Sequence, residues 1–183
     1  TGKIGFWDDK RIKADDNPGL PHVPIRLVVR SDGSGTSAQF TRFLHETVPS
    51  VWNAFTHACG VSTPVDGISY YPYGRPGCLP NAIGQKGSDG VANYVTNPGL
   101  GQGAIGYVEA SYALQRHIPV VGVKNRSGNY ALPTAKNVAT ALQHAKLNND
   151  STQELSQVYT ASEAFAYPIS SYSYMIIPTG ADD

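Results

Sequence analysis

Short apolar segments alternate with polar, glycine-rich segments along the chain. The run "PIRLVV" at residues 24–29 is apolar and β-branched, which predicts a short buried strand ending near Arg30. From Thr36 to Val48 apolar residues recur with the spacing of an amphipathic helix. The pattern therefore predicts a strand, a polar loop and a helix in direct succession.

The same alternation continues through the rest of the chain. Residues 49–86 are rich in Gly, Pro and Tyr and are expected to form a loop with short strands. Alternating strands and helices predict an α/β class, with a mainly parallel sheet flanked by helices. The length suits a single domain over residues 1–183, or one large lobe. Further helices are expected over 88–97, 109–117 and 133–147, further strands over 103–108, 119–125 and 167–177, and a turn over 126–129.

The loop after the first predicted strand, "RSDGSGT", has the chemistry of an anion site. Arg30 supplies a planar fork of donors suited to a tetrahedral oxyanion. Ser34 and Thr36 add hydroxyl groups, and Gly35 lets the backbone approach a ligand at a helix N-terminus, where unpaired N–H groups attract anions. Asp32 is expected to hold the guanidinium in place. The alternative is an ordinary helix cap with a surface Arg–Asp pair.

Composition narrows the classes of partner. The formal net charge is zero and 15% of residues are charged, which argues against nucleic acid as the main partner. No apolar run approaches the roughly 18 residues that a membrane-spanning helix needs, so no membrane insertion is expected of this segment. The first ten residues lack the pattern of a signal peptide, so the mature protein starts here or the chain has been trimmed.

Cys59 and Cys78 flank a long irregular stretch and are either two unrelated buried thiols or a disulfide. We favour the disulfide, because it would close a loop of about 20 residues and contribute roughly 3 kcal/mol in the chain-entropy model. A disulfide in turn favours an oxidising, extracytoplasmic location.

Other motifs predict no cofactor, metal or catalytic centre. The glycines of "GLGQGAIG" follow a predicted helix and a proline instead of a strand, which excludes a dinucleotide fingerprint. "GSGTS" lacks the lysine of a nucleotide-binding P-loop, and "DGSGT" is not a nucleophile elbow. The five histidines show no metal spacing. Asn125 and Asn149 begin glycosylation sequons that matter only in a eukaryotic secretory host.

Several segments, in order, resemble one known family. The chain is similar to the phosphate-binding proteins of ABC phosphate uptake, the PstS-like members of the type II periplasmic-binding-protein superfamily. The "RSDGSGT" loop resembles the family's phosphate-contacting signature. The other segments that carry the resemblance are "GKIGFWDDKRI", "NPGLPHVPIRLVV", "KGSDGVANYV", "GAIGYVEASYAL", "LPTAKNVATAL" and "YPISSYSYMII".

The resemblance implies a role for each residue of the loop. Arg30 would make charged hydrogen bonds to inorganic phosphate, and Asp32 would pair with the arginine. Ser34 and Thr36 would each contribute a hydroxyl and a backbone N–H, and Gly35 a backbone N–H. The segment that begins at Lys86 and continues as "GSDG" would start another helix facing the cleft, and we expect no ligand in it.

Family members clamp phosphate between two lobes, and this chain resembles mainly the second. The first lobe, with its own phosphate contacts and the aspartate that accepts the phosphate's proton, is expected to be absent from the chain. Half of the donors would leave about −4 kcal/mol of binding free energy, which is millimolar affinity. A lone lobe is also expected to discriminate poorly between phosphate and sulfate.

The expected function is that of the solute-binding component of an ABC phosphate transporter, with membrane permease subunits as partners of the full protein. An enzyme would need a nucleophile or metal cluster beside Arg30, and the sequence offers neither. The alternative is a sensory or adhesive module that uses its surface, including residues 68–77, for protein contacts. The intact anion loop favours the phosphate-binding function over this alternative.

Overall fold

The structure is a computed structural model that describes residues 2–15, 17–62, 64 and 66–174. The chain divides into two compact units, Thr1–Val121 and Gly122–Asp183, and each is described by itself.

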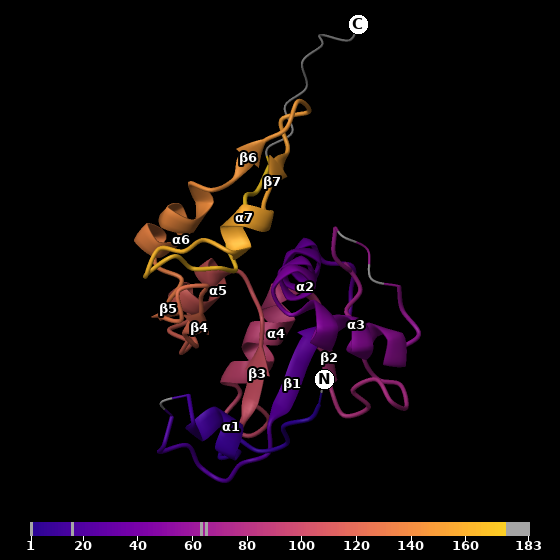
Figure 1. Ribbon diagram of the computed structural model, residues 1–183. Coiled ribbons are helices and arrows are strands. Elements are labelled where there is room, and N and C mark those ends of the chain that lie inside the picture. Colours follow the sequence, from indigo (N-terminus) through magenta and orange to yellow (C-terminus); the bar gives the residue numbers. More distant parts are fainter. Residues whose placement is uncertain (1, 16, 63, 65, 175–183) are drawn as a thin grey trace, which may run out of the picture. The chain divides into compact units, whose positions relative to one another are not determined.

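A three-stranded parallel sheet forms the centre of the first unit (Figure 1). The middle strand is β1 (Arg26–Arg30), with β2 (Ile83–Gln85) on one side and β3 (Ala104–Gly106) on the other. Val28 and Val29 are almost completely buried, as expected of a central strand covered on both faces. The parallel sheet and its helices confirm the predicted α/β class.

Helices follow or connect these strands. α2 (Gly35–Thr47) begins directly after the loop that leaves β1 and packs on α3 (Pro49–Ala58). α4 (Gly87–Thr96) packs against all three strands and against α5 (Ala110–Gln115). The predicted helices at 36–48, 88–97 and 109–117 and the predicted strand at 24–29 are confirmed to within a few residues. A further short helix, α1, spans Lys10–Lys13.

The prediction of a loop after Val48 is wrong for its first ten residues, which form α3. Pro49 occupies the first turn, where a missing N–H costs nothing. Trp52 and Phe55 then face the interior and are buried. The apolar residues of this segment have helical spacing in the sequence. The prediction was wrong because the Gly, Pro and Tyr residues after Ala58 dominate the composition of residues 49–86.

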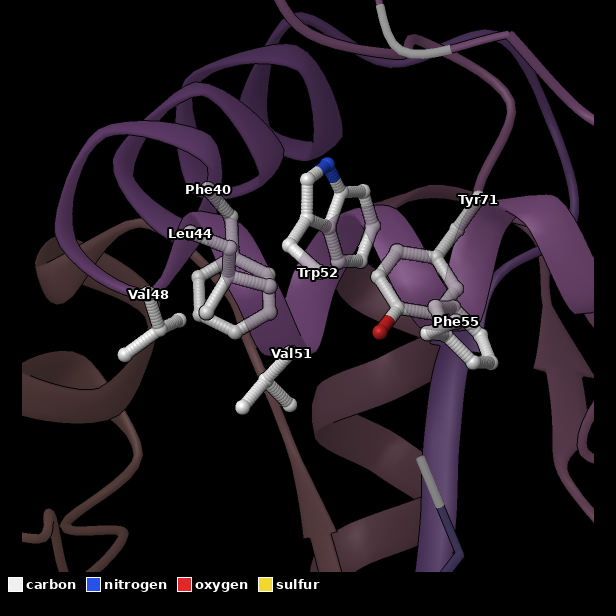
Figure 2. Close-up of a pocket in the computed structure, with 7 residues that line it drawn as sticks. All are labelled: Phe40, Leu44, Val48, Val51, Trp52, Phe55 and Tyr71. Carbon is white, nitrogen blue, oxygen red and sulfur yellow. The ribbon is translucent and has the colours of Figure 1, made fainter.

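An apolar pocket lies where α2 meets α3 (Figure 2). Its volume is about 220 Å³. The Tyr71 ring closes one side beside Phe55, with their ring centroids 6.3 Å apart. Its lining residues are Phe40, Leu44, Val48, Val51, Trp52, Phe55 and Tyr71.

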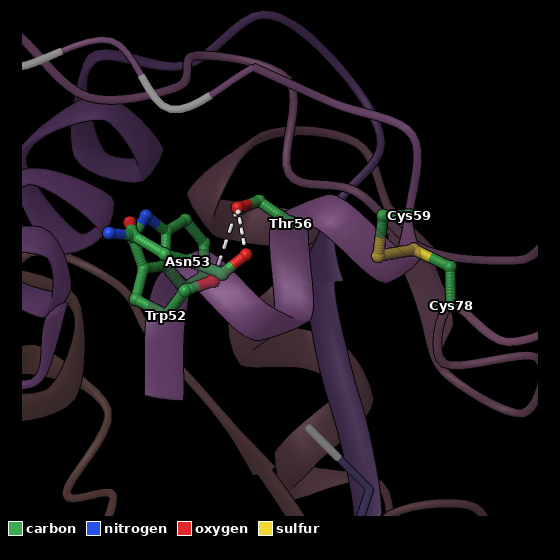
Figure 3. The surroundings of a disulfide bond; sticks show 5 residues. All are labelled: Trp52, Asn53, Thr56, Cys59 and Cys78. Atoms are coloured by element: carbon green, nitrogen blue, oxygen red, sulfur yellow. Dashed lines mark hydrogen bonds between the residues drawn. A yellow bond between two sulfur atoms is a disulfide. The ribbon is translucent and has the colours of Figure 1, made fainter. Parts of the chain in front are cut away.

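Cys59 and Cys78 form a disulfide, so the pairing favoured from the sequence is present in the structure (Figure 3). Cys59 caps the end of α3, and both cysteines belong to a buried cluster with Trp52, Phe55 and Leu79. The disulfide therefore fixes the far end of the long loop to the core of the first unit.

The second unit is built from short elements (Figure 1). Its two antiparallel hairpins pair β4 with β5 and β6 with β7. The predicted turn at 126–129 is confirmed between β4 and β5. Asn125 directs its buried Nδ2 toward the carbonyl groups of Glu163, Ala164 and Ala166, at 3.0–3.2 Å. The elements are β4 (Val123–Lys124), β5 (Tyr130–Ala131), α6 (Ala135–Leu142), β6 (Lys146–Leu147), β7 (Gln153–Glu154) and α7 (Ser156–Tyr159).

Three predictions for the second half of the chain need correction. The strand expected at 119–125 is reduced to β4, and the helix expected at 133–147 ends at Leu142 because the following residues pair as β6. The strand expected at 167–177 is not formed over 167–174, where the Ser170 hydroxyl donates to the Tyr167 carbonyl in a local turn. Residues 175–177 lie outside the described residues.

Candidate anion-binding site

Arg30 stands at the carboxyl end of β1 and is held there by Asp32. Its Nε donates to Asp32 Oδ1 at 2.9 Å, and its Nη2 donates to Asp32 Oδ2 at 2.7 Å. The same carboxylate accepts the Gly87 N–H at 3.0 Å, which ties the loop to the start of α4. The hydrogen bonds from Arg30 and then from Gly87 hold the pKa of Asp32 well below its ordinary value. Asp32 thus fixes the guanidinium, as the sequence analysis expected.

The Arg30 side chain is nearly buried but keeps unused donors. Only 9% of the residue is exposed. Its Nη1 donates to the Ser88 hydroxyl at 3.2 Å, so three of the five guanidinium N–H groups are engaged. The other two N–H groups have no hydrogen-bond partner among the described residues. A positioned cation with free donors is suited to binding an oxyanion.

The first turn of α2 lies beside this arginine in sequence and supplies further donors. The Ser34 hydroxyl oxygen caps the helix by accepting the Ser37 N–H at 3.1 Å, which leaves the hydroxyl proton free to point elsewhere. Gly35 and Thr36 occupy the first two helical positions, whose N–H groups precede the intrahelical bonds. Within the described part of the chain, neither amide has a partner.

One expected donor is already used. The Ser34 N–H donates to the Ser69 carbonyl at 3.0 Å, in the loop that precedes β2. This corrects the expectation that Ser34 offers both hydroxyl and backbone N–H to a ligand, because the loop geometry commits the amide to Ser69. The hydroxyl of Ser34 remains the group that can bind.

Glu109 closes the cluster from the N-cap position of α5. Its Oε1 accepts the Thr36 hydroxyl at 2.5 Å, and its Oε2 accepts the Ser88 hydroxyl at 2.5 Å. Burial alone would raise the pKa of Glu109, but the hydrogen bonds from Ser88 and Thr36 outweigh it and the pKa lies below its ordinary value. Glu109 is therefore ionised at neutral pH, and in this structure the Thr36 hydroxyl serves Glu109.

Tyr107 connects the cluster to the apolar interior. Its hydroxyl lies 2.6 Å from Ser37 Oγ and 3.4 Å from the Arg30 backbone nitrogen, from which it accepts. Its ring stacks on Phe40, a residue of the apolar pocket, with centroids 4.8 Å apart. Burial raises the pKa of Tyr107, so the phenol stays protonated at neutral pH. The residues that line the apolar pocket carry no charge, and Phe40 connects the pocket to the anion cluster through its contact with Tyr107.

Sequence reasoning found the local part of the cluster and missed the distant part. Arg30, Asp32, Ser34, Gly35 and Thr36 are consecutive or nearly so, and their pattern was readable. The missed members are Ser88, Tyr107 and Glu109. Ser88 lies in the "GSDG" segment that was recognised as a helix start but not as a source of contacts.

No group of His, Cys, Asp and Glu residues suited to a metal ion occurs in the described part of the chain. Over the same residues, no helix is both long and apolar enough to cross a membrane.

Comparison with known proteins relates the chain to one superfamily. A family model described as a PBP superfamily domain matches residues 1–183. "Phosphate-binding protein PstS" of Xylella fastidiosa (strain Temecula1) is 34% identical over 185 residues, covering 100% of this chain and 45% of that protein. The protein of the same name from Methanocaldococcus jannaschii is 32% identical over 186 residues, and the match covers 96% of this chain and 44% of that protein. The protein of that name from Haemophilus influenzae is 27% identical over 183 residues, and the match covers 100% of this chain and 49% of that protein.

The chain spans less than half the length of these relatives. Their names describe them as phosphate-binding proteins. The match over the whole chain shows that it belongs to the PBP superfamily and is related to the PstS phosphate-binding proteins.

Proposed function

We propose that this chain binds inorganic phosphate at the carboxyl end of β1, through Arg30, Ser34, Gly35 and Thr36, with Asp32 in support. The observation that carries the proposal is the nearly buried Arg30, fixed by Asp32 and keeping two unused N–H groups next to the capped start of α2. The names of the related proteins support phosphate as the anion.

The chemistry of these donors suits phosphate. A tetrahedral oxyanion offers several oxygens in different directions. The guanidinium, the two free amides of α2 and the Ser34 hydroxyl can each donate to a different oxygen. The positive end of the α2 dipole adds to the attraction. Because the chain has no net charge, this attraction is local to the site and does not come from the whole surface.

We further propose that the chain acts as the second lobe of a two-lobed, extracytoplasmic solute-binding component of an ABC phosphate transporter. The relatives are about twice as long as the chain, which supports a role as part of a larger clamp. The Cys59–Cys78 disulfide supports an oxidising location. Permease subunits would then be the partners of the full protein.

The test is a calorimetric titration of the chain with phosphate and, separately, with sulfate. We expect a dissociation constant of about a millimolar for phosphate, corresponding to roughly −4 kcal/mol, and little preference over sulfate. Replacing Arg30 by Ala should weaken phosphate binding at least tenfold, since a charged hydrogen bond contributes about 1.5–3 kcal/mol. Arg30→Lys keeps the charge without the fork and should lie between the two.

Arg26→Ala is the matched control. Arg26 lies on the same strand, at its other end, and its exposed side chain donates to the Leu100 carbonyl. Its removal takes away the same charge and should leave phosphate binding unchanged. Absence of binding at tens of millimolar phosphate, or equal losses in Arg26→Ala and Arg30→Ala, would contradict the proposal.

A further inference from the structure

Glu109 holds a position that an anionic ligand would take. Thr36 is the second residue of α2 and Ser88 is the second residue of α4, so the two hydroxyls that Glu109 accepts stand at the N-termini of two helices. Helix N-termini attract negative charge. The carboxylate therefore sits where two dipoles and two hydroxyls converge, one contact away from Arg30 through Ser88.

Glu109 gives the cluster a surplus of one negative charge. Arg30 and Asp32 balance each other in a close ion pair. Glu109 adds one negative charge that no cation contacts directly within the described part of the chain. A phosphate bound next to Arg30 would bring one or two further negative charges close to this carboxylate. Two negative charges on neighbouring groups of one site repel each other.

The position of Glu109 in the fold allows its side chain to rotate away from Thr36 and Ser88. It is the N-cap residue of α5, yet its side chain makes no capping bond to that helix. The residue is exposed, whereas Ser88 is buried. Rotation of the side chain toward solvent would break the side-chain hydrogen bonds that it makes to Thr36 and Ser88, which an arriving oxyanion can replace.

We propose that Glu109 is an internal competitor for the anion site: its carboxylate occupies the Thr36 and Ser88 hydroxyls when the site is empty, and an incoming phosphate must displace it. This inference rests on the proposed function. Because phosphate must displace the carboxylate, the affinity for phosphate is lower and its release is easier. Ser88 then becomes a fourth side chain that can contact the ligand, besides Arg30, Ser34 and Thr36. The opposite role is that of a positioning residue, in which Glu109 orients the two hydroxyls and strengthens binding.

Glu109→Gln separates the two roles, because glutamine keeps the size of the side chain and removes its charge. A competitor predicts tighter phosphate binding, by about tenfold if the lost repulsion is near 1.4 kcal/mol. A positioning residue predicts weaker binding. Glu46→Gln is the matched control: it removes the same charge from α2, about 16 Å along the helix from Gly35 at 1.5 Å per residue.

The experiment is a phosphate titration of the wild-type chain, Glu109→Gln, Glu46→Gln and Glu109→Gln combined with Arg30→Ala. We expect tighter binding for Glu109→Gln alone, no change for Glu46→Gln, and loss of the gain in the double variant. Wild-type binding with an unchanged or weaker Glu109→Gln would overturn the competitor and leave the phosphate site standing. No binding by any variant at tens of millimolar would overturn both. Binding by Glu109→Gln alone, dependent on Arg30, would support both.

Discussion

Asp32 determines what Arg30 can do. It accepts from Nε and Nη2 along one edge of the guanidinium and from the Gly87 N–H at the start of α4, so the remaining donors of Arg30 have a fixed direction. An acidic residue beside an anion site is unfavourable by itself. Here the carboxylate accepts hydrogen bonds from the arginine and from a backbone N–H, and its contribution is to hold the guanidinium in position.

The stability of the first unit should depend on pH through Asp32. Its pKa in the folded chain is depressed below the ordinary 3.8, so its stabilising contribution is present above that value and is lost as pH falls below it. Asp32→Asn should therefore lower the thermal midpoint at pH 7, and the difference from wild type should shrink toward pH 3. Thermal unfolding followed by tryptophan fluorescence measures this, since Trp7 and Trp52 both lie in the first unit.

The exposed Asp66 provides the comparison for this pH experiment. Asp66→Asn should leave the midpoint near that of wild type at both pH values. An Asp32→Asn difference that stays constant from pH 7 to pH 3 would show that the ion pair is not its source.

The residues of the cluster also show how far a sequence can predict a site. The spacing of Arg30, Asp32 and Ser34 expresses local geometry: a strand end, a tight loop and a helix cap. Glu109 is 73 positions from Thr36, and Ser88 is 58 positions from Arg30. Only the pairing of β1 with β2 and β3 brings those positions together. A single sequence does not contain that register.

At the scale of elements, the central strand β1 was predictable because its buried position makes its sequence apolar and β-branched, whereas β2 is a half-buried Ile-Gly-Gln segment inside a stretch rich in Gly, Pro and Tyr and was not located from the sequence. The short elements of the second unit were not predictable either. Its strands are two residues long, and such pairs depend on turns such as that at Gly128, where φ is +85°, more than on any periodicity. Helix α6 was predicted too long, because periodicity does not show where a following hairpin begins.

The disulfide is the element-scale feature with the clearest expected effect. Replacing Cys59 and Cys78 together by serine should lower the free energy of unfolding by about 3 kcal/mol, because the denatured chain regains the freedom of a closed loop. Chemical denaturation followed by tryptophan fluorescence measures this for the first unit, where Trp52 packs in the same buried cluster.

Reducing agent supplies the control for the disulfide. It should destabilise the wild-type chain by a similar amount and should not affect the double-serine variant. Equal stability of the oxidised wild type and the variant would mean that the loop is held by the Trp52 cluster without the bond.

At the scale of the whole molecule, the family assignment and the phosphate proposal rest on different grounds. The family follows from a match over the full chain. The proposal of phosphate binding rests on the geometry around Arg30 together with the names of relatives that are about twice as long. Under the proposal that this chain acts as one lobe of a larger clamp, we expect it to bind with only part of the affinity of the complete clamp. Micromolar affinity needs roughly −8 kcal/mol, about twice what one lobe is expected to supply.

The central claim is that the anion binds at the first turn of α2 beside Arg30. The most direct measurement is a two-dimensional ¹⁵N–¹H NMR titration of the chain with phosphate. We predict that the largest shifts occur at the backbone amides of Gly35 and Thr36 and at the Arg30 Nε, with half-saturation near the calorimetric dissociation constant. Shifts confined to other helix starts, such as that of α6 at Ala135, with α2 unchanged, would contradict the account.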